Sequence, residues 1–354
     1  MVRIGLALVL ASLLTACGSE RAQPTFFPDD NPALLSAWGQ FEMSGGTLQP
    51  ATGVVAYDLN APLFSDYAAK LRTVWSVAGP AAPMPDGTLN FAEGTVITKT
   101  FYYGAEGDTV THLSGEDIST LNLGQTRILE TRLLVKRTDG WHAISYVWDD
   151  DQSDARLKRT GAVIPLTLAS ADSTDSFAYL VPNENQCAAC HVSDTRTGAL
   201  HPLGPTLQQL NRGTQLASWQ DAGLLPAGAE PPFVQAAWDD QAAALDDRAR
   251  SYLAANCAHC HNPHGPADTS GLDLSLDATG AAVGFCKPPI AAGSGTGGHR
   301  FGINPGEAET SILHHRMAST APGSMMPELG RSLAHKEGVD LIAEWIDGMD
   351  GDCS

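Results

Sequence analysis

Residues 127–148, RILETRLLVKRTDGWHAISYVW, contain two strand-like runs separated by a turn signal. The runs 127–137 and 141–148 are rich in residues that favour β-strands. Asp139 and Gly140 lie between them, and an Asp-Gly pair flanked by such runs is a strong hairpin signal. This stretch therefore predicts an antiparallel hairpin and places the surrounding region among β-rich folds.

The same pattern continues on both sides of the hairpin. Residues 95–103, TVITKTFYY, and the shorter runs 163–168 and 177–181 also read as strands. We therefore expect residues 32–181 to form an antiparallel, sandwich-like β-domain whose aromatic side chains belong to the core.

Helical periodicity begins after residue 182. One set of apolar residues runs directly into a cysteine at 257, and a second set closes the chain. The first set is Leu245, Ala249, Tyr252 and Leu253, and the second is Val339, Ile342, Ile346 and Met349.

The N-terminus resembles that of an exported lipoprotein. Arg3 precedes an apolar run of secretory length, which is too short to span a bilayer and ends in Leu14-Thr15-Ala16-Cys17. We expect residues 1–16 to be a signal peptide, Cys17 to be lipidated and residues 17–31 to be a tether. The alternative is an ordinary signal peptide beside an unrelated cysteine. Gly18 is not the acidic residue associated with inner-membrane retention, which favours an outer-membrane anchor facing the periplasm.

The charge balance excludes one class of function. The 354 residues include 40 acidic and 21 basic side chains, for a formal net charge of −19. Binding to nucleic acid needs a positive field, so a nucleic-acid role is excluded.

Four of the seven cysteines form two Cys-x-x-Cys-His motifs, Cys187 to His191 and Cys257 to His261. Two thiols at this spacing can each add to one vinyl group of a haem, and the following histidine then lies under the iron. The motifs predict two covalently bound haem c groups, held by Cys187, Cys190, His191, Cys257, Cys260 and His261.

Three other uses of these cysteines compete with haem. Structural zinc pairs usually lie closer in sequence than these two. A thioredoxin-like redox pair or two structural disulfides would leave the repeated histidine unexplained. The remaining even pair, Cys286 and Cys353, predicts a disulfide in an exported protein.

The axial iron ligands differ between the two expected sites. At the second, His261 is the expected proximal ligand and Met326 the distal one, with Met325 as its competitor. At the first, His191 is proximal and the carbonyl of Pro205 is expected to accept the hydrogen of its Nδ1. The distal ligand there is His201, a residue from another domain, or none; His201 is also readily read as a surface histidine.

Several stretches together resemble a bacterial family of dihaem c-type cytochromes with an N-terminal β-rich region. They include DLNAPLFSDY (58–67), GTVITKTFYY (94–103), HPLGPTLQQLN (201–211), NCAHCHNPHGPADTSGLDL (256–274) and PGSMMPELG (322–330), with 130–148 and 185–191. The resemblance implies haem binding, electron carriage and residence outside the cytoplasm, but no substrate.

These observations predict an α+β multidomain protein, in which an antiparallel β-sandwich-like domain precedes a mostly α, cytochrome c-like haem region. The expected parts are the signal peptide 1–16, the tether 17–31, the β-domain 32–181, a first haem segment 182–240 and a cytochrome c-like domain 241–354.

The expected function is electron transfer, with a periplasmic dehydrogenase or quinol-linked complex among the possible partners. The alternatives are a haem enzyme such as a peroxidase, acting through an open first haem, or a redox-sensing or binding module. The sequence favours a carrier over an enzyme, because the β-region shows no catalytic motif.

Overall fold

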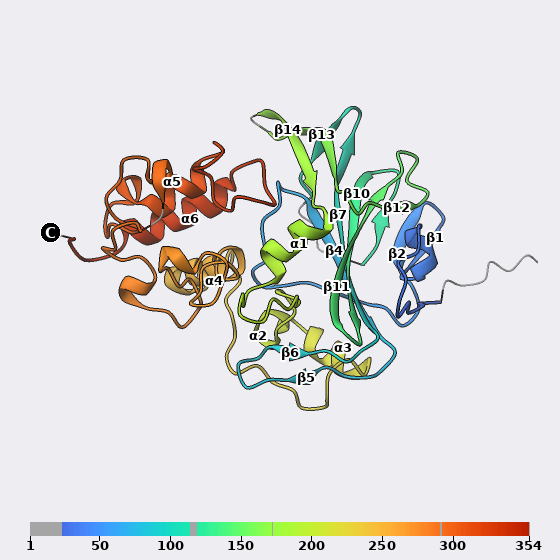
Figure 1. Cartoon of the computed structure of the whole chain (residues 1–354). Helices are drawn as coiled ribbons and strands as arrows, with labels where there is room; N and C mark the ends of the chain where they lie inside the picture. The colour runs from blue at the N-terminus through green and yellow to red at the C-terminus, as the bar shows by residue number, and fades with distance from the viewer. Residues whose placement is uncertain (1–22, 114–118, 172, 291, 354) are drawn as a thin grey trace, which may run out of the picture.

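The computed structural model describes residues 23–113, 119–171, 173–290 and 292–353 (Figure 1). The expected signal peptide and the lipidation site Cys17 lie outside these residues, as does the first part of the tether. Within the described residues, no helix is long and apolar enough to cross a membrane.

A nine-stranded sheet forms the body of the N-terminal part. Its longest strands, with 12 residues each, pair side by side, and the neighbouring pairs are antiparallel except for one parallel pair between β8 and β13. Its strands are β3 (Val55–Tyr57), β4 (Ala69–Ser76), β7 (Thr95–Glu106), β8 (Thr109–Thr111), β10 (Thr126–Arg137), β11 (Gly140–Trp148), β12 (Ala155–Leu157), β13 (Ala162–Ala169) and β14 (Thr174–Val181).

Two small sheets accompany the large one. They are a three-stranded sheet of β1 (Phe41–Ser44), β2 (Thr47–Pro50) and β9 (Leu121–Asn122), and a pair of β5 (Ala82–Pro83) and β6 (Leu89–Asn90). The hairpin expected at residues 127–148 is present as β10 and β11, and its strands meet at Arg137 and Gly140.

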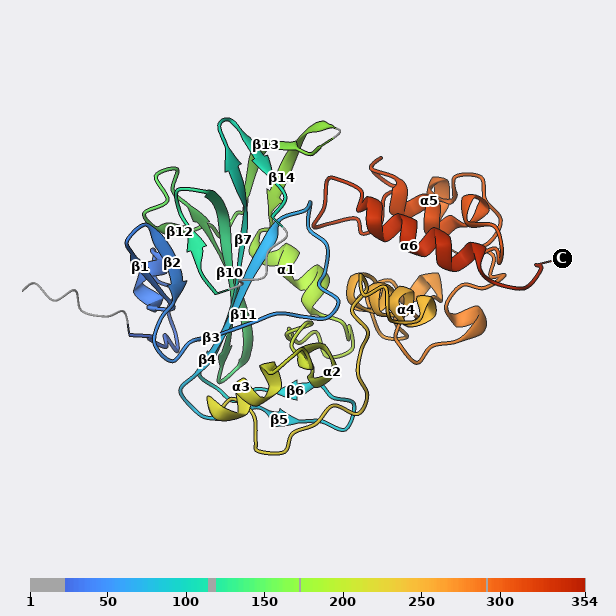
Figure 2. The same ribbon diagram turned by 180° about the vertical axis from the view of Figure 1, so that it is seen from behind.

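The C-terminal part is built from short helices and long irregular segments (Figures 1 and 2). The α-helices are α1 (Glu184–His191), α2 (Leu207–Leu210), α3 (Gln215–Asp221), α4 (Leu245–Asn256), α5 (Ile312–Ala318) and α6 (Lys336–Asp347). The 3-10 helices of this part are η2 (Asp268–Ser270), η3 (Gly280–Ala282), η4 (Gly293–Thr296) and η5 (Ala308–Thr310), whereas η1 (Leu35–Trp38) precedes the strands and packs in the N-terminal part.

The expected fold class is wrong. The β part is a curled half-barrel sheet rather than a sandwich, and the C-terminal part is not a mostly α, cytochrome c-like region, since helices make up only 21% of the structure. Long twisted strands curl a sheet, which explains the first difference. Frequent Gly and Pro residues explain the second, because Pro removes a backbone donor and ends helices.

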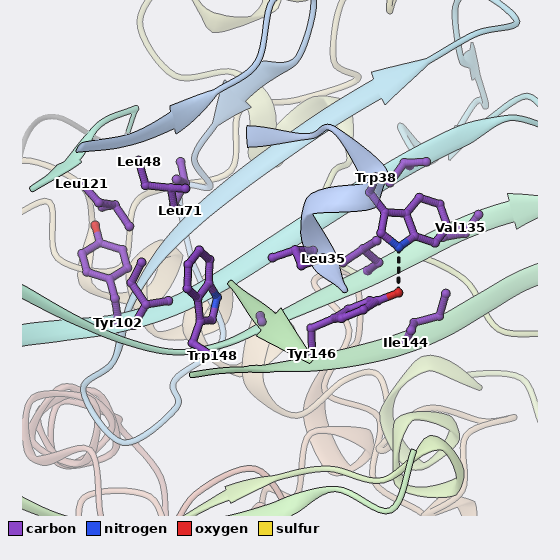
Figure 3. Close-up of a cluster of buried hydrophobic side chains, with 14 residues drawn as sticks. Leu35, Trp38, Leu48, Leu71, Tyr102, Leu121, Val135, Ile144, Tyr146 and Trp148 are labelled. Carbon is purple, nitrogen blue, oxygen red and sulfur yellow. Dashed lines mark hydrogen bonds between the residues drawn. The ribbon is translucent and has the colours of Figure 1, made fainter. Parts of the chain in front are cut away.

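The strand β7 separates two environments, because successive side chains on a strand point to opposite faces. Val96 and Tyr102 point into a core shared with the three-stranded sheet and η1. Figure 3 shows this core, in which Nε1 of Trp38 donates a hydrogen bond of 2.7 Å to the hydroxyl of Tyr146. On the other face, Ile97 and Phe101 belong to two further clusters, and Lys99 lies between them.

We expect Tyr146→Phe to lower the free energy of unfolding by about 1–3 kcal/mol, because it leaves the buried Nε1 of Trp38 without an acceptor. The same hydroxyl donates to the carbonyl oxygen of Pro32 at 2.8 Å. Urea unfolding of the wild type, Y146F, Trp38→Phe and the double variant would isolate the pair. Strictly additive losses would contradict this assignment.

A disulfide joins Cys286 and Cys353, the pair expected from the sequence, and closes a loop with a sequence separation of 67 residues. Replacing both with Ser is expected to lower the free energy of unfolding of the C-terminal part by about 2–4 kcal/mol, because the unfolded chain gains freedom. Denaturant titrations with and without reductant provide the measurement. Only the wild type should respond to reductant, and an equal response of both proteins would refute the bond.

Candidate functional site

The first Cys-x-x-Cys-His motif lies entirely on the eight-residue helix α1. Asn183 caps this helix, since its side chain accepts a hydrogen bond from the backbone N–H of Gln186. The side chain of Gln186 accepts one from the backbone N–H of Asn183 in return. This reciprocal cap starts a helix directly after β14 and orients Cys187, Cys190 and His191 from one rigid turn.

The second motif follows α4, which ends at Asn256 immediately before Cys257. The N–H of Cys257 still donates to the carbonyl of Leu253 at 2.8 Å. One turn later, the N–H of His261 donates to the carbonyl of Cys257 at 2.9 Å. The helix expected from the apolar periodicity therefore delivers this motif.

The two motifs meet, although 66 residues separate Cys190 from Cys257 in the chain. The Sγ of Cys260 contacts the carbonyl oxygen of Ala189 at 3.5 Å. Behind the motifs, the side chain of Asn262 donates to the carbonyl of Ser193 at 3.2 Å. The backbone N–H of Thr195 donates to the carbonyl of His264 at 2.9 Å, which closes the contact. We call this set of contacts the motif junction.

Two cavities adjoin at the motif junction. The smaller, of about 170 Å³, is lined by Cys187, Cys190 and His191 and lies against the large sheet. The larger, of about 550 Å³, is lined by Cys257, Cys260 and His261 and lies in the C-terminal part. The lining residues common to both are Phe64, Cys190, His259, Pro327, Leu329 and Arg331.

Each motif histidine donates its Nδ1 hydrogen to a fixed acceptor. For His191 this is the carbonyl oxygen of His201 at 2.8 Å. For His261 it is the hydroxyl of Ser270 at 3.0 Å, whose own hydrogen goes to the carbonyl of Ala267. In the neutral rings, Nε2 is then the nitrogen with the free lone pair. Burial lowers the pKa of His191 to about 3 and that of His261 to about 4, which keeps both rings neutral at pH 7.

The motif thiols are neutral as well. Burial raises the pKa of Cys257 to about 12 and that of Cys260 to about 11. Burial also raises the pKa of the first pair of thiols. Redox-active Cys-x-x-Cys thiols have lowered pKa values, so this environment opposes thioredoxin-like exchange.

The other expected site residues lie at different places around the two cavities. Met326 lines the larger cavity with the second motif, and Met325 is not among the lining residues. Pro205 lines the smaller cavity, but the acceptor for Nδ1 of His191 is the carbonyl of His201 instead. The ring of His201 itself bonds through Nε2 to the hydroxyl of Ser193 at 2.8 Å.

The expected cofactors are contradicted. Within the described ranges, no three His, Cys, Asp or Glu side chains are grouped so that they could hold a metal ion. The prediction of two covalently bound haem c groups, with their iron, is therefore wrong by this test. His201, which the sequence offered as a second iron ligand beside His191, instead forms a hydrogen bond through its Nε2 with the hydroxyl of Ser193.

Sequence reasoning missed Arg331, which fixes the loop that carries Met326. Its guanidinium donates to the carbonyl of Met326 at 2.7 Å and to that of Ser319 at 2.9 Å. The carboxylate of Asp66 holds the next two residues by accepting from the N–H groups of Ser332 and Leu333. No motif marks these residues, because they act on backbone groups brought close only by the fold.

Sequence reasoning also missed a group of cations on the face of the large sheet that carries the smaller cavity. Its members are Lys70, Arg72, Lys99 and Arg132, which come from β4, β7 and β10. The only available signal was the presence of charged residues at alternate positions of otherwise apolar strands.

Comparison with known proteins gives no match to any protein-family model, curated protein or solved structure.

His335 lines the larger cavity where it contacts Phe64, a residue that precedes β4. Its ring stacks on Phe64 with centroids 4.3 Å apart, and its Nδ1 lies 3.0 Å from the hydroxyl of Tyr252. Burial lowers the pKa of His335 to about 4, although the carboxylate of Glu337 opposes the shift. In the unfolded chain the pKa of a histidine is about 6.5.

Because the folded pKa of His335 is the lower one, its contribution to stability is complete above pH 6.5 and is lost as the pH falls towards 4. We expect His335→Phe, which keeps a stacking ring, to reduce the acid-induced loss of unfolding free energy by about 2–3 kcal/mol. Urea titrations at pH 7 and pH 4 measure this difference. His264→Phe, at an exposed position, is the matched control, and identical pH profiles for H335F and the wild type would rule out the effect.

Proposed function

We propose that this chain is an exported electron-transfer protein that passes electrons between redox partners through the two adjoining cavities. The observation that carries the proposal is the motif junction, which brings Cys260 to 3.5 Å from the carbonyl of Ala189. Two cavities with the same triad of residue types, sharing His259 and Cys190 in their walls, provide two redox positions in contact.

The two motifs present the same chemistry to the two cavities. Both cysteine pairs are kept protonated by burial, and both histidines are kept neutral with a lone pair on Nε2. Electrons that enter one cavity therefore have a short route across the motif junction to the other.

The distribution of charge supports protein partners with basic docking patches. The chain has 40 acidic and 21 basic side chains, and several of the basic ones line the cavities. The remaining surface is correspondingly acidic, which steers basic partners towards it. A periplasmic dehydrogenase or a quinol-linked complex is the proposed type of donor.

The proposed location follows from the leader sequence. Residues 1–16 are proposed to direct export, and lipid on Cys17 to hold the protein on the periplasmic side of the envelope, at the outer membrane. The family resemblance drawn from the sequence implies the same side of the envelope and the same electron carriage.

The test is to count the electrons that the exported, purified protein accepts in a mediated coulometric titration. The wild type should accept electrons reversibly, and C187S/C190S and C257S/C260S should each accept about half as many, because each variant removes one of two redox positions. C286S/C353S, which removes the structural disulfide instead, should keep the full count as long as the titration stays above about −300 mV, where such a disulfide is not reduced.

Intact mass measured on the same samples shows what the thiols carry. One electron per motif indicates a one-electron centre, and two indicate a dithiol–disulfide couple. No reversible uptake in the wild type would refute the proposal. Sustained peroxide reduction that disappears in C187S/C190S would replace the carrier with the peroxidase alternative.

A further inference from the structure

Three cations lie side by side on the sheet face that lines the smaller cavity. In the strand register, Arg72 on β4 is directly opposite Lys99 on β7, and Lys99 is directly opposite Arg132 on β10. Side chains in such positions have Cβ atoms about 4.5–5.5 Å apart, and like charges placed there destabilise a sheet. We call these three residues the cationic row.

All the charged side chains that line this cavity are cations apart from the motif thiols and histidines. Lys70 and Arg331 join the cationic row, and among the described residues no Asp or Glu lines the cavity. This arrangement occurs in a chain with almost twice as many acidic as basic side chains. A concentration of one charge inside a protein of the opposite sign requires an explanation beyond the fold.

Only the ends of the cationic row have carboxylate partners. Arg72 pairs with Asp58 at 2.7 Å. Arg132 binds both oxygens of the fully buried Glu130, at 2.8 and 2.5 Å. The hydroxyl of Tyr179 donates to the same carboxylate at 2.8 Å, so three hydrogen bonds already engage Glu130, and none of them comes from Lys99.

Two lysines remain without an ion pair to a carboxylate in the described structure. Lys70 donates to the carbonyl oxygen of Ala68 at 3.0 Å, and the Nζ of Lys99 lies 5.3 Å from the ring centroid of Phe101. Lys99 is the central member of the cationic row, with a guanidinium on each side. Burial and these two guanidinium groups lower the pKa of Lys99 to about 7, and a negative group placed beside it would favour its charged form.

We infer that the smaller cavity binds a carboxylate-bearing organic ligand, with Lys99 as the central contact and Arg72 and Arg132 at its sides. The apolar part of the ligand fits the remaining walls, which include Leu59, Leu134 and Ile144. A volume of about 170 Å³ suits a small organic acid or one arm of a larger molecule.

The source of this carboxylate is a free organic acid that enters the cavity from solution. The inference does not rest on the electron-transfer proposal, because binding is measured without any redox partner.

Lys99→Met tests the inference, since it removes the charge and keeps the length of the side chain. Lys158→Met, at an exposed position, removes a charge of the same kind elsewhere. Succinate is titrated calorimetrically into the wild type and both variants at pH 6.5 and fixed ionic strength. Intact mass and the absorption spectrum of each protein are recorded in parallel, and thermal melts confirm folding.

The inference is supported if succinate binds the wild type and K158M equally but binds K99M at least tenfold more weakly, while the masses and spectra of the three proteins differ only by the substitutions. Equal succinate binding by all three proteins, or no binding by the wild type, overturns the inference. The electron count tests the redox proposal separately.

Discussion

The register of β7 between β4 and β10 is the constraint on which both the fold and the cavities depend. Side chains alternate between faces along a strand, so a shift of one residue would exchange Lys99 with the apolar core behind it. The pairing of β7 with β10 changes register between Ile128 and Glu130. This irregularity leaves Ile128 in the core of the opposite face while Arg132 lies opposite Lys99.

The same sheet places α1, and α1 places the motif junction. Only two residues lie between the end of β14 and the start of this helix, so its position follows directly from the sheet. The second motif comes from α4 in the other part of the chain (Figures 1 and 2). Because mostly polar contacts join the two motifs, hydrogen-bond geometry specifies the junction, and the two motifs lie close together without merging the two cores.

The sequence was informative where a local signal determined the structure. The Asp-Gly pair predicted the β10–β11 hairpin, the apolar period predicted α4 ahead of Cys257, and an even remainder of cysteines predicted the Cys286–Cys353 bond. Prediction from the sequence failed for features that depend on contacts between residues far apart in the chain. A single curled sheet cannot be distinguished from a sandwich by alternation alone. The contact of Ala189 with Cys260 also has no local signature, and residue spacing alone led to the contradicted cofactor prediction.

The cationic row shows why those failures matter for function. Lys99 and Arg132 were visible as charged residues within strands, but their significance appears only when the register places them opposite each other. Burying them costs stability, and a chain free to optimise packing alone would replace Lys99 with an apolar residue. Asp58 and Glu130 offset the charges of the two arginines, so the fold already contains the means to neutralise such a position. Lys99 forms no ion pair with a carboxylate among the described residues, which argues that its counter-charge comes from a bound ligand.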